Sequence, residues 1–381
     1  MKITIVMGFF LPIPPDAGGA IEKSWHRLAQ GLALRGHQVT IISRRWKDWP
    51  HDEIKNGIRY LRLQGFDHTT KLGLNLLYDF IWSWRVFMNL PKGDVVALNT
   101  VSLACWLGGR RNQAGRVIAM PGRMPKGQFR FYRKPARILV PSSPVKKAVI
   151  QERPSFSPLI RTTGYPIDYQ SLSRSISKED EVITIGYIGR INREKGIELL
   201  IEASRQLMNR KLPSWKIVVC GPSGISQGGS GPEYLNSLKE QSPQCIEYHG
   251  AIFNELDLHD IYRRCDLFCY PSMADQGETF GVSIVEAMAA GAVPVVSDLQ
   301  CFRDFISPGK NGLTFDAHAD DASVQLANNL ERLITDRNHR EVLSHAAQMT
   351  AKHYDYEAYI ERLLEDFTEL TKPSTTALSS P

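Results

Sequence analysis

The amino-acid sequence predicts an α/β protein built from two Rossmann-like, doubly wound domains. Short apolar runs alternate with helical patterns along both halves of the chain, as in sheets whose parallel strands are connected by helices. A chain of 381 residues is also longer than one hydrophobic core usually holds. The alternation is interrupted between Tyr165 and Ser177, where Pro166 and several Ser and Asp residues occur. We therefore expect an N-terminal domain of residues 1–165 and a C-terminal domain of residues 166–354.

The N-terminal domain is expected to contain six strands. They lie at Ile3–Met7, Val39–Ser43, Ile58–Leu63, Val95–Leu98, Val117–Ala119 and Ile138–Val140. The segment from Met1 to Leu11 is apolar like a signal peptide, but it is short and prolines follow it. We interpret it as a first strand that stays in the mature protein. A helix is expected from Ala20 to Arg35, with Gly36 ending it. Its apolar positions are Ile21, Leu28, Leu32 and Leu34.

Two adjacent glycines, Gly18 and Gly19, precede this helix. Glycine has no Cβ atom, so the backbone at these positions can approach a ligand closely. The free N–H groups at the start of a helix also favour an anion. The pair is therefore a candidate for binding part of a phosphorylated ligand, and a plain loop with two glycines is the alternative interpretation.

The C-terminal domain is expected to contain five strands. They lie at Val182–Ile188, Lys216–Cys220, Ile246–Tyr248, Leu267–Tyr270 and Val293–Ser297. The glycine-rich segment Gly221–Gly231 lacks the Gly-Lys-Ser/Thr ending of a phosphate-binding P-loop, so we interpret it as a flexible loop. A last helix is expected over Tyr356–Leu370, followed by a disordered tail of residues 372–381.

Two glutamates frame the most informative segment of the chain. Glu278 lies on a loop flanked by glycines, and Glu286 lies eight residues later, inside an apolar helix that starts near Val282. A carboxylate in an apolar helix needs a partner. Two carboxylates about two turns apart suit a ligand with hydroxyl groups at two places, such as a sugar nucleotide. The alternative is that Glu278 only favours the helix N-terminus and Glu286 pairs with a buried Lys or Arg.

Two cations follow the first strand of the C-terminal domain. Arg190 comes directly after the strand, and Lys195 precedes Gly196 at the start of a helix that continues through Leu200 and Ala203. Ligands of open α/β sheets gather at the carboxyl ends of strands, where helix N-termini favour anions. Two fixed cations there can neutralise a diphosphate and stabilise the charge that develops as it leaves. Ordinary surface charges are the alternative interpretation of either residue alone.

Taken together, these motifs resemble the retaining family 4 glycosyltransferases, which have the GT-B fold. The resemblance is close from about residue 182 to 300 and looser before it. It rests on the glycine pair, the segment Gly186-Tyr-Ile-Gly-Arg190 with Lys195-Gly196, Pro271-Ser272, Glu278 and Glu286 with seven residues between them, and Gly291-Ala-Val-Pro294. The resemblance implies two Rossmann-like domains that face a central cleft. It also implies a C-terminal helix, about residues 355–371, that packs back on the N-terminal domain.

The same resemblance implies the roles of the site residues. The donor would be a nucleotide-diphosphate sugar, with no cofactor and no required metal. Arg190 and Lys195 would hold the diphosphate, Glu286 the ribose hydroxyls, and Glu278 the donor sugar. The backbone of Thr279, Phe280 and Gly281 would assist Glu278, and Gly18 and Gly19 would contact the diphosphate from the N-terminal domain. Arg190, Lys195 and Glu278 are then the expected catalytic residues.

One family feature is absent from this sequence. Many members carry a His in a first-domain loop near the donor sugar, and the corresponding segment here reads Met120-Pro-Gly-Arg123. In the usual account of retaining enzymes of this fold, the leaving phosphate accepts the proton of the acceptor on the same face, so no dedicated base is needed. Arg123 is a candidate for part of the work of the missing His.

Composition restricts the compartment and the partners. The six Cys form no Cys-x-x-Cys and no His/Cys ligand cluster, which indicates reduced thiols in the cytoplasm and argues against disulfides or zinc. Residues 1–165 hold 26 Lys and Arg against 9 Asp and Glu, and six of the seven Trp. This basic, Trp-rich half is expected to face an anionic or interfacial partner. Nucleic acid is excluded as the partner because none of its usual binding motifs occurs.

Two segments of the basic half invite a membrane interpretation. Leu72–Leu90 is apolar and aromatic, but it contains Asp79 and Arg85, which argues against a membrane-spanning helix. It is predicted to be a helix packed on the sheet, and an amphipathic helix on a membrane is the alternative. A following run combines aromatic residues with cations that could bind an acceptor phosphate or anionic lipid, or be merely solvated. Its candidate residues are Arg123, Lys126, Arg130, Arg133 and Lys134.

The resemblance thus implies a retaining, metal-independent glycosyltransferase. It would move a sugar from a nucleotide-diphosphate sugar, with UDP favoured, to a hydroxyl of a glycan, lipid or lipid-linked acceptor in cell-surface polysaccharide or glycolipid synthesis. The expected location is the cytoplasm, with peripheral attachment to the inner face of the cytoplasmic membrane as an extension. A nucleotide-sugar epimerase of the same fold, a GDP- or ADP-sugar transferase and a non-enzymatic nucleotide-binding scaffold are the alternatives.

Overall fold

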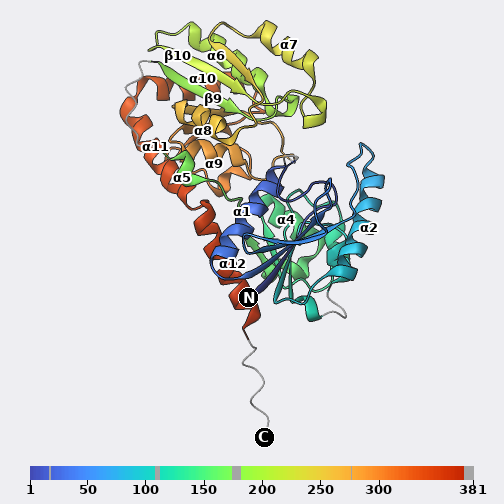
Figure 1. Cartoon of the computed structure of the whole chain (residues 1–381). Helices are drawn as coiled ribbons and strands as arrows, with labels where there is room; N and C mark the ends of the chain where they lie inside the picture. Colours follow the sequence, from blue (N-terminus) through green and yellow to red (C-terminus); the bar gives the residue numbers. More distant parts are fainter. Residues whose placement is uncertain (17–18, 108–111, 174–181, 276, 373–381) are drawn as a thin grey trace. The chain divides into compact units, whose positions relative to one another are not determined.

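The computed structural model describes residues 1–16, 19–107, 112–173, 182–275 and 277–372. Contacts between Cα atoms divide the chain into two compact units (Figure 1). The first unit contains Met1–Gly164 together with the chain from Tyr356 onward, and the second contains Tyr165–Asp355. Each unit has its own mainly parallel sheet with helices packed on it, so the predicted α/β class is confirmed.

The first unit contains an eight-stranded sheet in the order β3-β4-β2-β1-β5-β6-β7-β8. Every neighbouring pair is parallel except β3 and β4. The strands are β1 (Lys2–Val6), β2 (Gln38–Arg44), β3 (Asp52–Lys55), β4 (Ile58–Leu63), β5 (Val95–Leu98), β6 (Arg116–Ala119), β7 (Arg137–Val140) and β8 (Ile160–Thr162). The six predicted strands are all present, whereas the edge strands β3 and β8 were not predicted.

Helices cover both faces of this sheet. They are α1 (Ala20–Leu34), α2 (Leu72–Asn89), α3 (Leu103–Trp106), α4 (Ser143–Glu152) and α12 (Tyr356–Thr371), with short 3-10 turns η1 (Asn112–Ala114), η2 (Gln128–Phe131) and η3 (Pro154–Leu159). Side chains of β1 alternate between the two faces. Ile5 faces the core formed with α1 and α12, and Val6 faces the core formed with α2 and α4.

The predicted apolar face of α1 needs a correction. Leu28 and Leu32 are buried, but Ile21 and Leu34 are exposed. Trp25 is buried in their place, and its indole N–H donates a hydrogen bond to Asn99 at 3.0 Å. The large indole ring therefore defines the inward face of the helix more strongly than the two aliphatic side chains do.

Helix α12 is held on the first unit by apolar packing and by ion pairs. Ile360, Leu363 and Phe367 are buried in its core. The buried Asp366 pairs with Arg137 at 3.3 Å and with Arg161 at 3.0 Å. Near the start of the helix, Glu357 and Glu361 both pair with Arg35 of the α1 C-terminus, and near its end Glu369 pairs with Arg137 and Arg161.

The second unit contains a six-stranded parallel sheet in the order β11-β10-β9-β12-β13-β14. The strands are β9 (Ile183–Ile188), β10 (Trp215–Cys220), β11 (Ile246–Gly250), β12 (Leu267–Tyr270), β13 (Val293–Ser297) and β14 (Leu313–Phe315). All five predicted strands are present, and the three-residue β14 was not predicted. The chain leaves β9 toward β10 on one side and leaves β12 toward β13 on the other. The carboxyl ends of β9 and β12 therefore form the topological switch point, the usual ligand position in such sheets.

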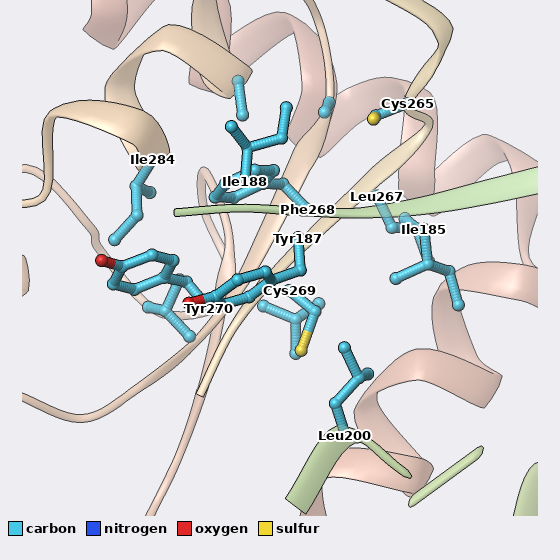
Figure 2. Packing of buried hydrophobic residues seen from close by; sticks show 14 of the residues in the cluster. Ile185, Tyr187, Ile188, Leu200, Cys265, Leu267, Phe268, Cys269, Tyr270 and Ile284 are labelled. Atoms are coloured by element: carbon cyan, nitrogen blue, oxygen red, sulfur yellow. The ribbon is translucent and has the colours of Figure 1, made fainter. Parts of the chain in front are cut away.

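The core of the second unit is rich in aromatic residues along β9 and β12. Figure 2 shows Tyr187 and Tyr270 side by side, and their rings stack at 5.7 Å between centroids. The surrounding helices are α5 (Tyr169–Leu172), α6 (Ile197–Met208), α7 (Pro232–Gln241), α8 (Glu255–Arg264), α9 (Val282–Ala289), α10 (Ala322–Thr335) and α11 (Arg337–Lys352), with η4 (Arg193–Lys195), η5 (Ile225–Gln227) and η6 (Phe302–Asp304). The predicted site residues follow these two strands in the sequence, Arg190 and Lys195 after β9 and Glu278 after β12.

Candidate functional site

The turn that carries Lys195 is pressed against the loop after β12. Gly196 has a φ of 64°, and a Cβ atom there would lie 2.1 Å from the carbonyl oxygen of Pro271. Only glycine fits such a close approach in this left-handed conformation. The N–H of Met273 donates to the carbonyl of Glu194 at 2.8 Å, which fixes the two segments together. Asn192 caps the turn by accepting from the N–H of Glu194 at 3.1 Å.

This close approach brings Lys195 and Glu278 into contact although they are 83 positions apart. The Lys195 Nζ lies 2.6 Å from the Glu278 Oε2, and the two side chains are only 3% and 12% exposed. Ser272 lies 3.4 Å from the same carboxylate oxygen, and the ammonium also lies 5.6 Å from the centre of the Tyr270 ring. The predicted diphosphate cation and the predicted sugar-binding carboxylate are therefore direct partners.

Arg190 is more exposed than Lys195 but is also fixed in position. Its guanidinium donates to the carbonyl of Gly228 at 3.1 Å and pairs with Glu194 at 3.3 Å. The Gly221–Gly231 loop therefore contacts the candidate site, although the sequence indicated only a flexible loop. Glu194 also lies 3.7 Å from the Lys195 Nζ, so it lies between the two predicted cations. No role was predicted for Glu194, because charged residues are common at the starts of helices.

Glu286 lies on the second turn of α9 and has one identified partner. The hydroxyl of Tyr262, from α8, donates to the Glu286 Oε2 at 2.8 Å. Burial raises the pKa of Glu286 to about 7, the Tyr262 hydrogen bond opposes this shift, and the nearby Glu255 adds to it. Within the described residues no Lys or Arg pairs with Glu286, which disfavours the buried-ion-pair interpretation. Tyr262 was not predicted as a site residue, because nothing in the neighbouring sequence distinguishes it from a core tyrosine.

Three residues between the two glutamates were predicted to contact the donor sugar through their backbone. The Phe280 side chain is buried against Phe305 and Tyr354, so only its backbone is available to a ligand. Gly281 begins α9 with a φ of 96°, and a Cβ atom there would come 2.7 Å from the Phe302 ring. Thr279 precedes them and is half-buried.

The glycine pair of the first unit is described only in part. Gly18 lies outside the described residues. Gly19 has a φ of 94° and directly precedes α1, where its carbonyl accepts from the N–H of Lys23 at 3.0 Å. A Cβ atom on Gly19 would lie 2.1 Å from the Glu22 Oε2. Glu22 is a buried carboxylate that the sequence did not single out, and burial raises its pKa.

The basic run of the first unit forms an exposed loop around η2. Its position is fixed by Glu152, which accepts from the N–H groups of Gly127 at 2.5 Å and Phe129 at 3.0 Å. The candidate side chains all point to solvent, and none forms an ion pair within the described part of the chain. They are Arg123, Lys126, Arg130, Arg133 and Lys134.

Among the described residues, no group of three or more His, Cys, Asp and Glu side chains is arranged to hold a metal ion. All six Cys are free thiols. The charged groups described at the switch point are Arg190, Glu194, Lys195 and Glu278, and Glu286 lies in the helix that follows Glu278.

Comparison with known proteins gives this arrangement a family. The model of the glycosyl transferases group 1 family matches residues 168–350, which include Arg190, Lys195, Glu278 and Glu286. An uncharacterized glycosyltransferase of Methanocaldococcus jannaschii is 30% identical over 392 residues, covering 91% of this chain and 93% of the relative. The chain belongs to the group 1 glycosyltransferases. The resemblance seen in the sequence is therefore confirmed.

One further relative and one solved structure match this group 1 glycosyltransferase along almost all of its length. The lipopolysaccharide 1,2-N-acetylglucosaminetransferase of Salmonella typhimurium is 27% identical over 380 residues, 96% of this chain and 97% of the relative. An Anabaena protein solved in complex with UDP and glucose superposes with a TM-score of 0.71 at 17% identity, covering 97% of this chain and 100% of the other. At that identity the superposition establishes the fold, which is GT-B.

Tyr262→Phe tests the setting of Glu286 in this glycosyltransferase. Loss of the hydroxyl removes the hydrogen bond that lowers the pKa of Glu286, so that pKa should rise further. If Glu286 binds the ribose of UDP, the role proposed below, UDP affinity at neutral pH should fall a few-fold and the pH at which affinity is half-maximal should move upward, measured by calorimetry across pH. Tyr248→Phe is the matched control, because its hydroxyl contacts only Ser242 among the described contacts, at 2.8 Å. An unchanged pH midpoint in Tyr262→Phe would show that the Tyr262 hydroxyl does not influence the titration of Glu286.

Proposed function

We propose that this glycosyltransferase moves a sugar from a UDP-sugar to a hydroxyl of a glycan, lipid or lipid-linked acceptor with retention of anomeric configuration. The observation that carries the proposal is the buried pair of Lys195 and Glu278 at the sheet switch point, 2.6 Å apart. A cation that would bind the diphosphate and a carboxylate that would bind sugar hydroxyls are thereby held side by side, as a donor would require where its sugar ring joins the leaving diphosphate.

Lys195 and Arg190 would stabilise the diphosphate as it leaves. The Lys195 ammonium has three N–H donors, so it can keep its contact with Glu278 and still donate to a phosphate oxygen. Arg190 would add a second cation, exchanging its contact with Glu194 for a phosphate. Fixed cations in a partly desolvated site lower the energy of the negative charge that grows in the transition state. We propose that they make a metal ion unnecessary.

Glu278 and Glu286 would orient the donor through its hydroxyl groups. Glu278 would accept from the sugar, and Glu286 from the ribose. Because the pKa of Glu286 lies at about 7, its ionised form, which accepts but does not donate, dominates only above neutral pH. Ribose binding should therefore strengthen as pH rises through 7.

Retention would follow from a same-face reaction. The bond from the anomeric carbon to the phosphate oxygen breaks, and a bond to the acceptor oxygen forms on the same face. The acceptor proton moves to the leaving phosphate, so no enzyme base is consumed. This account suits a chain in which Arg123 stands in the segment where many family members have a His.

The donor base and the acceptor class are inferred from relatives. UDP is favoured because the superposed Anabaena structure holds UDP and glucose. A cell-surface polysaccharide or glycolipid acceptor is favoured because the Salmonella relative, which matches along its whole length, is a lipopolysaccharide glycosyltransferase. Six free thiols suit a reducing compartment, so we place the reaction in the cytoplasm.

The proposed function predicts stabilisation by UDP-sugars and transfer without metal. In a thermal-unfolding screen of UDP-, GDP- and ADP-sugars, a UDP-sugar should raise the melting temperature most, by mass action. With that donor and an acceptor, activity should persist in EDTA, and the product should keep the anomeric configuration of the donor by NMR. Activity lost in EDTA and restored by magnesium would contradict the role of the two cations. Turnover of the donor to an epimer without acceptor would identify an epimerase instead.

A further inference from the structure

The outer face of α2 carries a stripe of exposed apolar side chains. Helix α2 lies on the outside of the first unit (Figure 1), and it is buried on its other face through Trp82, Ser83 and Val86. Phe80 and Trp84 are 51% and 54% exposed. The exposed residues recur every four positions, so they share one side of the helix. They are Leu72, Leu76, Phe80, Trp84 and Met88, with Leu77 beside them.

Aromatic residues extend this stripe beyond α2. The Trp106 ring, from α3, meets the Phe80 ring edge-on at 4.8 Å and the Trp84 ring at 5.7 Å. The basic loop joins the same neighbourhood, because the N–H of Arg133 donates to the carbonyl of Ala104 in α3 at 3.3 Å. Phe131 of that loop is 70% exposed. We call the α2 stripe together with Trp106 and Phe131 the α2 surface.

The charge around the α2 surface has one sign. Arg130, Arg133 and Lys134 are exposed beside Phe131. Helix α2 itself contains one carboxylate, Asp79, which points inward and accepts from the N–H groups of Val101 and Ser102. Residues 101–165 contain 13 Lys and Arg and a single carboxylate, Glu152, which is bound to backbone N–H groups of the basic loop. The α2 surface thus combines exposed apolar groups with unneutralised cations.

We propose that the α2 surface docks on an anionic membrane. Phe, Trp and Leu side chains can enter the boundary between head groups and acyl chains, while adjacent Arg and Lys attract anionic lipids. Aromatic residues, Met and Arg are also enriched in protein interfaces, so the assignment to lipid rests on the single sign of the charge beside the exposed apolar stripe. No helix among the described residues is long and apolar enough to cross a membrane, so the contact would be peripheral. This inference concerns the first unit and does not depend on the proposed donor.

Vesicle binding by the full-length protein tests the proposal. The protein should cosediment with phosphatidylcholine–phosphatidylglycerol vesicles, less with phosphatidylcholine alone, and less as salt rises. The double variant Phe80→Ser/Trp84→Ser should reduce partitioning by roughly tenfold or more, because two half-exposed aromatic rings lose their burial in lipid. Leu34→Ser/Ile54→Ser is the matched control, since both residues are strongly exposed apolar side chains of the same unit, outside the α2 surface. This control should bind like the wild type.

Charge reversal tests the contribution of the cations beside the α2 surface. Arg130→Glu/Arg133→Glu should abolish the preference for anionic vesicles, whereas the control Lys2→Glu/Lys55→Glu, at two other exposed positions of the unit, should keep most of it. All variants should retain the wild-type melting temperature and its increase with UDP. Equal vesicle binding by every variant, or none by the wild type at low salt, would overturn the proposal. Concentration-dependent dimers lost in Phe80→Ser/Trp84→Ser, without vesicle binding, would instead assign the surface to a second copy.

Discussion

Lys195→Ala should reduce turnover by about two to three orders of magnitude, the usual effect of removing one preorganised stabiliser of transition-state charge. It should also destabilise the fold, because Glu278 would keep a largely buried carboxylate without its partner at 2.6 Å. Breaking a buried pair in this way costs about 3–5 kcal/mol. Turnover is measured at saturating donor, and the free energy of unfolding by denaturant titration.

Two matched variants separate the two effects of Lys195. Lys216→Ala removes a lysine from the exposed pair with Glu247, and it should change stability by less than about 1 kcal/mol and leave turnover intact. The double variant Lys195→Met/Glu278→Gln removes both buried charges, so it should recover stability without recovering activity. A folded Lys195→Ala enzyme with wild-type turnover would refute the role that we give this ammonium.

Glu286→Gln should weaken UDP binding and at the same time stabilise the free protein above neutral pH. Hydrogen bonds to a charged group contribute about 1.5–3 kcal/mol, so affinity at pH 8 should fall about tenfold or more. The pKa of the carboxyl is about 7 in the folded state against an ordinary value of 4.5 for glutamate. Between these values the folded state binds more protons than the unfolded state, so the free energy of unfolding of the wild type falls as pH rises.

The neutral glutamine escapes this titration. We therefore expect Glu286→Gln to be more stable than the wild type above pH 7, by on the order of 1–3 kcal/mol, with the gain fading as pH falls toward 4.5. Denaturant titrations at several pH values measure the difference, and calorimetry with UDP measures the affinity. Glu233→Gln, at an exposed position of α7, should do neither. If the stability difference did not depend on pH, Glu286 would not be the buried titrating group.

Strands rich in Val, Ile and Leu were located from the sequence because both of their faces are buried. Ile58–Leu63 and Leu267–Tyr270 are observed with the predicted bounds. The antiparallel edge strand β3, Asp-Glu-Ile-Lys, was missed because a solvated edge needs no apolar run. For α1, periodicity found the helix but not its inward face, because it could not weigh Trp25 against Ile21 and Leu34.

The candidate site shows a similar division. Motif spacing placed Arg190 and Lys195 after β9 and Glu278 after β12, and these strands are neighbours in the sheet. The contact of Lys195 with Glu278 could not be predicted, because it depends on the close approach of Gly196 to Pro271. The pairing of Tyr262 with Glu286 depends on how α8 and α9 lie together, which no local pattern specifies. The ligands of these residues remain predictions.

The position of α12 has a consequence for the biosynthesis of the protein. A ribosome completes the second unit, up to Asp355, before it releases the helix that supplies Ile360 and Phe367 to the first core. Until then Arg137, at the start of β7 beside the edge strand β8, lacks Asp366 and Glu369, its partners on that helix. Domains otherwise tend to fold in the order in which they emerge. Here the unit that is synthesised first is finished last, so a nascent chain that stops before Tyr356 carries a complete sheet without the helix α12 that packs on one of its faces, and chaperones and proteases can recognise the apolar side chains left uncovered.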